Sequence, residues 1–143
     1  MRRKLRAVSE SISCEKVRWD VPMAQMTTLR LGGPADLVVE PSDMTDVRRI
    51  TCICQALDVP VLPVGRGSNL LVRDGGIRGV VLSTRRLDRL TVQEDTIIAG
   101  AGVPLSVLAR RAAEASLAGL TFAAGIPGSV GGAVLMNAGA YGG

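Results

Sequence analysis

The sequence contains no histidine among its 143 residues. It therefore cannot use Ser-His-Asp or Cys-His catalysis, and it cannot ligate zinc through histidine. Aromatic residues are almost as scarce, since only Trp19, Phe122 and Tyr141 are present, and no surface is available on which successive nucleic-acid bases could stack. No apolar run approaches the roughly 18 residues of a membrane-spanning helix. These absences predict a soluble, cytoplasmic protein that binds neither nucleic acid nor membrane.

Only three cysteines are present, at positions 14, 52 and 54. An odd number in a chain of this size does not suit a disulfide framework and is typical of a reducing compartment. Cys52 and Cys54 fall in a predicted helix, where side chains two positions apart diverge around the axis and cannot share a ligand. All three cysteines are interpreted as structural, and no metal-ligating residue is assigned.

The composition itself is that of a globular chain, with 47% hydrophobic and 21% charged residues. A net charge of +4 favours an anionic partner, and a nucleotide satisfies this as well as a nucleic acid does. The basic start at 2–6 lacks the apolar segment of a signal peptide, so it predicts a solvated helix or tail. The arginines later in the chain are interpreted as solvated charges: Arg85, Arg86, Arg89, Arg110 and Arg111.

Hydrophobic patterning predicts a mixed α and β fold. A strand at 35–40 precedes a helix with Ser42 or Asp43 as its N-cap, and this helix ends at 59–60. This β-α-β order favours parallel strands. A helix with Pro104 in its first turn and Gly119 as its C-cap is predicted near the end. The further predicted strands are 61–64 and 70–72, followed by 80–82, 90–92 and 96–99, the last three in an antiparallel or mixed arrangement.

Two glycine-rich segments carry the functional signal. The first, Gly-Arg-Gly-Ser-Asn at 65–69, lies at a strand end and offers backbone amides, a cation and a hydroxyl to a diphosphate. It is not a Rossmann motif, because Leu70 occupies the place of the third glycine and a strand is expected next. A tight turn between strands remains the alternative.

The second segment, 125–143, contains glycines at 125, 128, 131, 132 and 139, among other positions. So many glycines predict positive φ angles or a close approach to something large and flat, such as a planar cofactor. A flexible tail is the alternative, but Val134, Leu135 and Met136 are too apolar for a solvated linker.

Together with Thr-Thr-Leu-Arg-Leu-Gly-Gly-Pro-Ala-Asp at 27–36, these segments resemble the flavin-binding part of the UDP-N-acetylenolpyruvoylglucosamine reductases in their order and in their residues. The resemblance covers the chain from about Val21 onward. It implies an α+β fold, the FAD-binding domain of the vanillyl-alcohol-oxidase (PCMH-like) type with two α+β subdomains. It also implies an enzyme that takes hydride from NADPH onto FAD and delivers it to a UDP-sugar enolpyruvate, giving UDP-N-acetylmuramate for peptidoglycan.

The resemblance assigns cofactor binding to two sets of residues. The first set is Gly65, Arg66, Gly67, Ser68, Asn69 and Leu70; the second is Gly125, Ile126, Pro127, Gly128, Ser129, Gly131, Gly132, Asn137, Ala138, Gly139, Ala140 and Tyr141. It also implies an N-terminal extension at 1–20, a first FAD-binding subdomain at 21–82 and an incomplete second subdomain at 83–143.

The sequence departs from the family pattern in two ways. Met26 and Leu29 replace the family's usual histidine and phenylalanine in the opening motif. The tyrosine-arginine motif, the serine proton donor and the late glutamate have no counterpart here, so no catalytic residue is assigned and the substrate domain is absent. The chain alone is therefore expected to be inactive. Two other functions stay open: a non-catalytic flavin- or nucleotide-binding module, and another FAD-linked oxidoreductase of the same fold.

Overall fold

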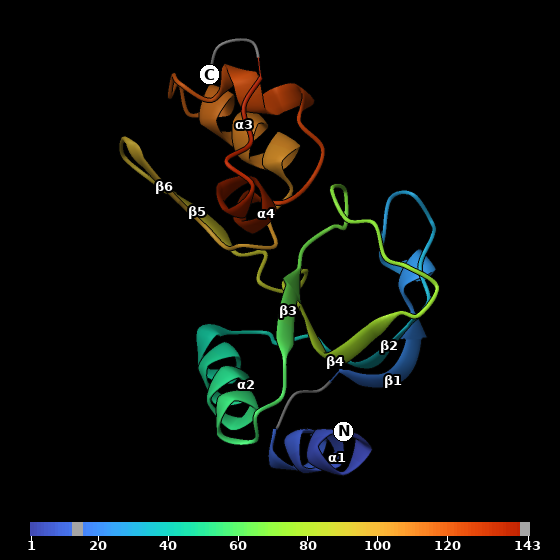
Figure 1. Cartoon of the computed structure of the whole chain (residues 1–143). Helices are drawn as coiled ribbons and strands as arrows, with labels where there is room; N and C mark the ends of the chain where they lie inside the picture. The colour runs from blue at the N-terminus through green and yellow to red at the C-terminus, as the bar shows by residue number, and fades with distance from the viewer. Residues whose placement is uncertain (13–15, 141–143) are drawn as a thin grey trace.

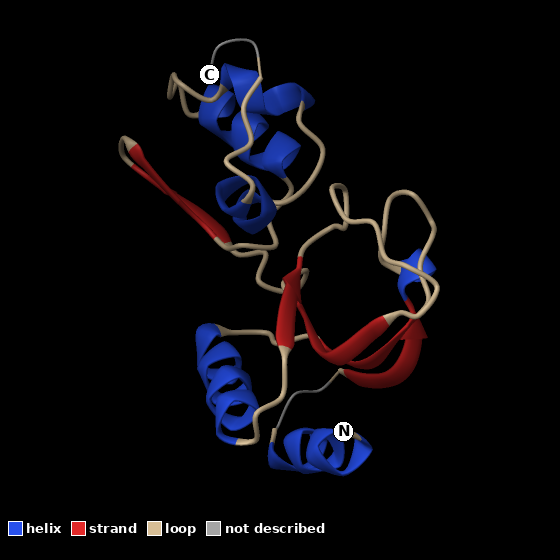
Figure 2. Ribbon diagram, viewed as in Figure 1, coloured by secondary structure: helices blue, strands red, loops and turns tan. Residues whose placement is uncertain are grey.

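The computed structural model describes residues 1–12 and 16–140 and arranges them in two groups of elements (Figures 1 and 2). The first group comprises α1 (Arg2–Ser11), β1 (Val17–Pro22), η1 (Met23–Gln25), β2 (Pro34–Val39), α2 (Met44–Ala56), β3 (Val61–Val64) and β4 (Ile77–Ser83). The second comprises β5 (Leu90–Gln93), β6 (Thr96–Ala99), α3 (Leu105–Glu114), η2 (Thr121–Gly125) and α4 (Val130–Leu135).

A four-stranded sheet in the order β1-β2-β4-β3 forms the first group. β1 pairs antiparallel with β2, while β4 pairs in parallel with both β2 and β3. The strands β2 and β3 that flank α2 are thus not neighbours, because β4 lies between them. β2 and β3 are still parallel to each other, as predicted, because each of them is parallel to β4. The strand predicted at 80–82 thus lies in a mixed sheet, whereas those predicted at 90–92 and 96–99 form a separate antiparallel pair.

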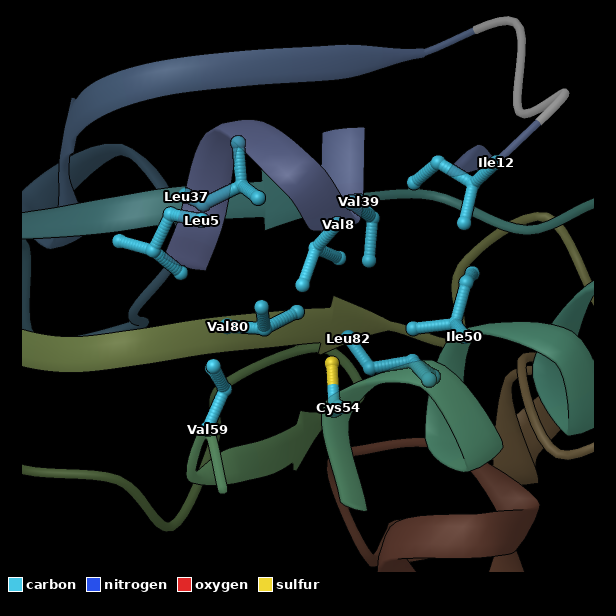
Figure 3. Close-up of a cluster of buried hydrophobic side chains, with 10 residues drawn as sticks. All are labelled: Leu5, Val8, Ile12, Leu37, Val39, Ile50, Cys54, Val59, Val80 and Leu82. Carbon is cyan, nitrogen blue, oxygen red and sulfur yellow. The ribbon is translucent and has the colours of Figure 1, made fainter. Parts of the chain in front are cut away.

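The two faces of this sheet bury different clusters, because successive side chains of a strand point to opposite faces. One face packs against α1 and α2, as Figure 3 shows: Leu5, Val8, Ile12, Leu37, Val39, Ile50, Cys54, Val59, Val80 and Leu82. The opposite face packs against loop residues and η1: Val21, Met23, Met26, Ala35, Val38, Val64, Val72 and Val81. The loops that bear the first glycine-rich segment therefore rest on a buried apolar layer.

The basic N-terminal segment is a helix whose apolar side belongs to the core. Leu5 and Val8 are fully buried against the sheet, while the arginines at 2, 3 and 6 are exposed. β1 already begins at Val17 and pairs with β2. Within the segment 1–20, expected as an N-terminal extension, α1 packs against the first sheet and the start of β1 is part of that sheet.

The helix predicted after the first strand is confirmed. α2 begins after Asp43, whose carboxylate accepts a hydrogen bond from the Asp46 amide at 2.9 Å. Cys54 is buried and Cys52 is exposed, so the two side chains diverge as their spacing predicts. Burial raises the pKa of the Cys54 thiol.

The strand predicted at 70–72 is wrong. These residues form an irregular segment that crosses the sheet face, with Leu70 and Val72 packed into the second cluster and Leu71 exposed. The apolar character of the segment reflects packing from above the sheet and not strand pairing. Periodicity alone does not distinguish these two situations.

The second group contains the antiparallel β5–β6 hairpin and the helices α3, η2 and α4. Val103, Leu105, Leu108 and Ala123 form its core. The predicted cap at Gly119 is wrong, because α3 ends at Glu114 and Ser116 adopts φ +58°. The Leu117 amide then returns to the Ala112 carbonyl at 2.8 Å and satisfies the helix end. In the described part of the chain, no helix has the length and apolarity needed to cross a membrane.

Candidate functional site

A cavity of about 510 Å³ lies between the two glycine-rich segments. One wall consists of the end of β3 and the loop that follows it, 62–70. The other wall consists of 126–129 and one side of α4. Figure 1 shows the chain leaving β3 for this loop on the side of the sheet where α4 lies. Segments about 60 residues apart in the sequence therefore form one site of the size that small ligands occupy.

The loop 65–69 is fixed tightly against the segment that precedes β2. Gly67 adopts φ +72°, and a Cβ atom there would lie 2.1 Å from the Met26 carbonyl oxygen. The Thr28 amide donates to the Gly67 carbonyl at 3.1 Å. Only glycine fits this position, because the conformation is left-handed and the neighbouring backbone leaves no space.

The polar groups of this loop remain available to a ligand. Among the described residues, no backbone carbonyl accepts a hydrogen bond from the amides of Arg66, Gly67, Ser68 or Asn69. Several unpaired amides on one loop are the arrangement that binds phosphate oxygens. The Ser68 hydroxyl lies across from Gly128, at 3.8 Å from where a Cβ would stand on that glycine.

The second glycine-rich segment differs from the expected open loop. Ser129 is the N-cap of α4 and accepts a hydrogen bond from the Gly132 amide at 3.4 Å. Among the described glycines of the segment, only Gly128 has a positive φ, at +134°. A Cβ on Gly131 would lie 2.7 Å from the Cβ of Ala101. Gly131 therefore serves helix packing, and of the two alternatives predicted for these glycines, positive φ applies to Gly128 alone among the described ones.

The two segments contact each other through Gly65 and Ser129. Ser129 is 1% exposed, and its hydroxyl would lie 2.3 Å from a Cβ atom at Gly65. An isolated bridge between Pro104 and Ser129 anchors the same point to the start of α3. A glycine at position 65 thus permits the close approach of the two walls.

Most of the predicted site residues line the main cavity: Gly65, Arg66, Gly67, Ser68, Asn69, Leu70, Ile126, Pro127, Gly128, Ser129, Gly132 and Ala138. Gly125 lines an adjoining cavity of about 350 Å³, which shares Arg66 and Ser68 with the first and adds Thr28 and Ser106. Gly131, Asn137, Gly139 and Ala140 line neither cavity. Tyr141 lies outside the described residues.

Sequence reasoning missed the apolar part of the lining. Leu62, Pro63 and Val64 contribute from β3, Ala133 and Leu135 from α4, and Met136 from the position directly after α4. Leu135 is 71% exposed and lines the cavity. The pattern that could have revealed α4 is the serine at 129 directly before an apolar run, since serine is a preferred N-cap.

Arg85, which the sequence predicts to be a solvated charge, is exposed, but it also binds backbone carbonyls. Its guanidinium donates from Nε to the Gly65 carbonyl at 3.2 Å and from Nη2 to the Met26 carbonyl at 3.1 Å. Arg85 therefore connects the first glycine-rich loop to the segment behind it.

Apolar walls, unpaired amides and adjoining arginine and serine side chains together define a class of protein that binds a large, phosphate-bearing cofactor. The comparisons with known proteins specify that class. A family model described as the FAD binding domain matches residues 35–143, so the chain belongs to the FAD-binding domain family.

Several curated relatives share one name. The UDP-N-acetylenolpyruvoylglucosamine reductase of Syntrophomonas wolfei is 49% identical over 130 residues, which cover 90% of this chain and 44% of the relative. The reductase of the same name from Staphylococcus aureus is 44% identical over 137 residues, covering 96% and 45%. The chain thus spans less than half the length of the curated relatives it matches.

Solved structures agree on the fold. The UDP-N-acetylenolpyruvylglucosamine reductase of Thermus caldophilus superposes with a TM-score of 0.71 at 35% identity, over 90% of this chain and 45% of that one. An alkyldihydroxyacetonephosphate synthase matches with a TM-score of 0.59 at 19% identity, over 80% and 25%, and this likeness shows the fold alone. The predicted fold class, the α+β FAD-binding domain of the vanillyl-alcohol-oxidase (PCMH-like) type, is confirmed.

Proposed function

We propose that this chain is the flavin-binding part of a UDP-N-acetylenolpyruvoylglucosamine reductase, an oxidoreductase of peptidoglycan synthesis. The observation that carries the proposal is the cavity of about 510 Å³ between the two glycine-rich segments, where the amides at 66–69 donate to no backbone carbonyl of the described residues. The relatives at 44–49% identity that bear this name support the choice of enzyme. A cytoplasmic location belongs to the same proposal, because the substrate class is a nucleotide sugar.

The residues of the cavity fit FAD in chemical character. The amides of Arg66, Gly67 and Ser68 would donate to the oxygens of the diphosphate, and the guanidinium of Arg66 adds positive charge. The small side chains at 128 and 132 permit close approach on the opposite wall. Leu62, Leu135 and Met136 present an apolar surface that would exclude water from the less polar portion of the cofactor.

This assignment separates the steps that this chain's residues serve from the steps that need the rest of the longer relatives. The chemistry that bound FAD supplies is hydride transfer from NADPH to the enolpyruvyl group of the UDP-sugar. This chain's own residues bind the cofactor, orient it and shield it. Binding of the UDP-sugar and protonation of the carbon adjacent to the one that receives hydride are assigned to the portion of the longer relatives that this chain does not match.

Flavin titration of the 143-residue chain tests the proposal. We expect the flavin absorbance to shift, the fluorescence to be quenched, and the melting temperature to rise with FAD concentration. Gly67→Ala should abolish binding, because its Cβ would collide with the Met26 carbonyl in a left-handed conformation. Gly75→Ala is the matched control, since nothing lies within 4 Å of a Cβ there. A wild-type chain that leaves the flavin spectrum unchanged would refute the proposal.

A further inference from the structure

Arg85 occupies the turn that leads from the first sheet to the β5–β6 hairpin. The Leu87 amide donates to the Thr84 carbonyl at 2.9 Å, which closes the turn around Arg85. A Cβ on Gly102 would lie 2.1 Å from the Thr84 carbonyl oxygen, so the turn is backed closely by the chain that precedes α3. The backbone of Arg85 is therefore fixed, and its side chain extends from a rigid base.

The guanidinium of Arg85 contacts consecutive carbonyls of the first glycine-rich loop. Nε donates to the Gly65 carbonyl at 3.2 Å, and Nη2 reaches the Arg66 carbonyl at 3.5 Å. Nη2 also donates to the Met26 carbonyl at 3.1 Å. The next carbonyl of the loop, that of Gly67, accepts from the Thr28 amide at 3.1 Å. Three successive carbonyls are thus bound on the protein side of the loop.

The direction of these carbonyls determines the direction of the amides. In a trans peptide the C=O and the following N–H point in opposite directions across a planar group. When the carbonyls of Gly65, Arg66 and Gly67 point toward Arg85 and Thr28, the amides of Arg66, Gly67 and Ser68 must point the other way. Among the described residues, these three amides donate to no backbone carbonyl, and all three residues line the cavity.

We infer that Arg85 is a positioning residue for cofactor binding: it binds the outer carbonyls of the loop 65–67 so that the amides of Arg66 and Gly67 face the phosphate oxygens of the cofactor. The inference rests on the proposed function, because it concerns the same cavity. The charge of Arg85 adds to the favourable potential for an anion, and its planar, multiple-donor head suits it to bind several carbonyls at once.

Paired flavin titrations of the 143-residue chain test the role of Arg85. Arg85→Met removes the donors and keeps the length of the side chain. We expect its dissociation constant for FAD to rise about tenfold or more, since charged hydrogen bonds to the loop are lost, while that for riboflavin, which has no phosphate, changes less than about twofold. Arg85→Lys should restore part of the FAD affinity. Arg48→Met, on the exposed side of α2, removes the same charge and should bind both flavins as the wild type does.

The outcomes separate this inference from the proposed function. If wild type binds FAD and Arg85→Met binds it equally well, the positioning role is refuted. If Arg85→Met loses FAD and riboflavin affinity to the same degree, or if Arg48→Met weakens FAD as much, the side chain acts through general stability or net charge and the inference is also refuted. A wild-type chain that binds no FAD refutes the proposed function and this inference together.

Discussion

Gly65 and Ser129 lie 64 positions apart in the sequence and meet at the junction of the two cavity walls. A Cβ at position 65 would lie 2.3 Å from the Ser129 hydroxyl but 3.4 Å from its Cβ. The hydroxyl, which also caps α4 through the Gly132 amide, is therefore the atom that forbids a side chain at position 65.

This geometry predicts an energetic coupling between the two residues. Gly65→Ala should lower the free energy of unfolding by about 1 kcal/mol, because the hydroxyl must rotate and abandon its cap. In a Ser129→Ala background the same substitution should cost little, which gives a coupling of about 1 kcal/mol. Urea unfolding of the four chains measures it, with Gly75→Ala as a control in open space. Strictly additive effects would contradict the contact.

Cys54 and Cys52 provide a second test at this scale. Burial raises the pKa of the Cys54 thiol, whereas Cys52 is exposed. In a Cys14→Ser background, we expect one thiol to react rapidly with a disulfide reagent in the native chain and the second only after denaturation. Fast reaction of two thiols in the native chain would show that Cys54 is not buried.

The same burial has a pH consequence. The unfolded chain can ionise Cys54 at its ordinary pKa, while the folded chain retains the proton to higher pH, so the folded state binds more protons in that range. The free energy of unfolding contributed by Cys54 is therefore complete below the ordinary thiol pKa and declines as pH rises above it. Comparing wild type with Cys54→Ala by urea unfolding at several alkaline pH values should isolate this decline.

At the scale of elements, α1 packs in the core, although its basic residues predict a solvated helix or tail. Its exposed side carries arginines, but Leu5 and Val8 are completely buried against the sheet. Leu5→Ala should therefore lower the free energy of unfolding by about 2–4 kcal/mol, through lost burial and a residual cavity. Arg3→Ala, on the exposed side, should change it by less than about 0.5 kcal/mol. Thermal or urea unfolding distinguishes the two, and equal effects would show that α1 does not belong to the core.

At the scale of the whole molecule, the cavity couples two groups of elements with separate cores. A ligand that contacts both walls should protect both from exchange with solvent. In hydrogen exchange with and without FAD, we expect slower exchange in 65–69 and in 126–133 together, and unchanged exchange in α1 and α2, which pack on the opposite face of the sheet. Protection of only one wall would mean that the ligand binds one group alone.

The sequence by itself determined the elements whose signals are local. Asp43 before an amphipathic run defines α2, the run at 35–40 defines β2, and the glycines at 65 and 67 mark the loop that lines the cavity. The residues of these segments and their order also identified the FAD-binding family, because a motif can be read directly from consecutive residues. These features need no knowledge of distant contacts.

The tertiary structure alone decided the rest, because each remaining feature depends on residues far apart in the chain. The apolar run at 70–72 covers a sheet face instead of pairing, and the basic helix α1 is a core element because its opposite side meets β2 and β4. Arg85 carries no local mark of function, yet the fold brings it to the carbonyls of Gly65 and Met26. A hydrogen bond or a packed surface requires both partners, and the sequence places only one of them at a time.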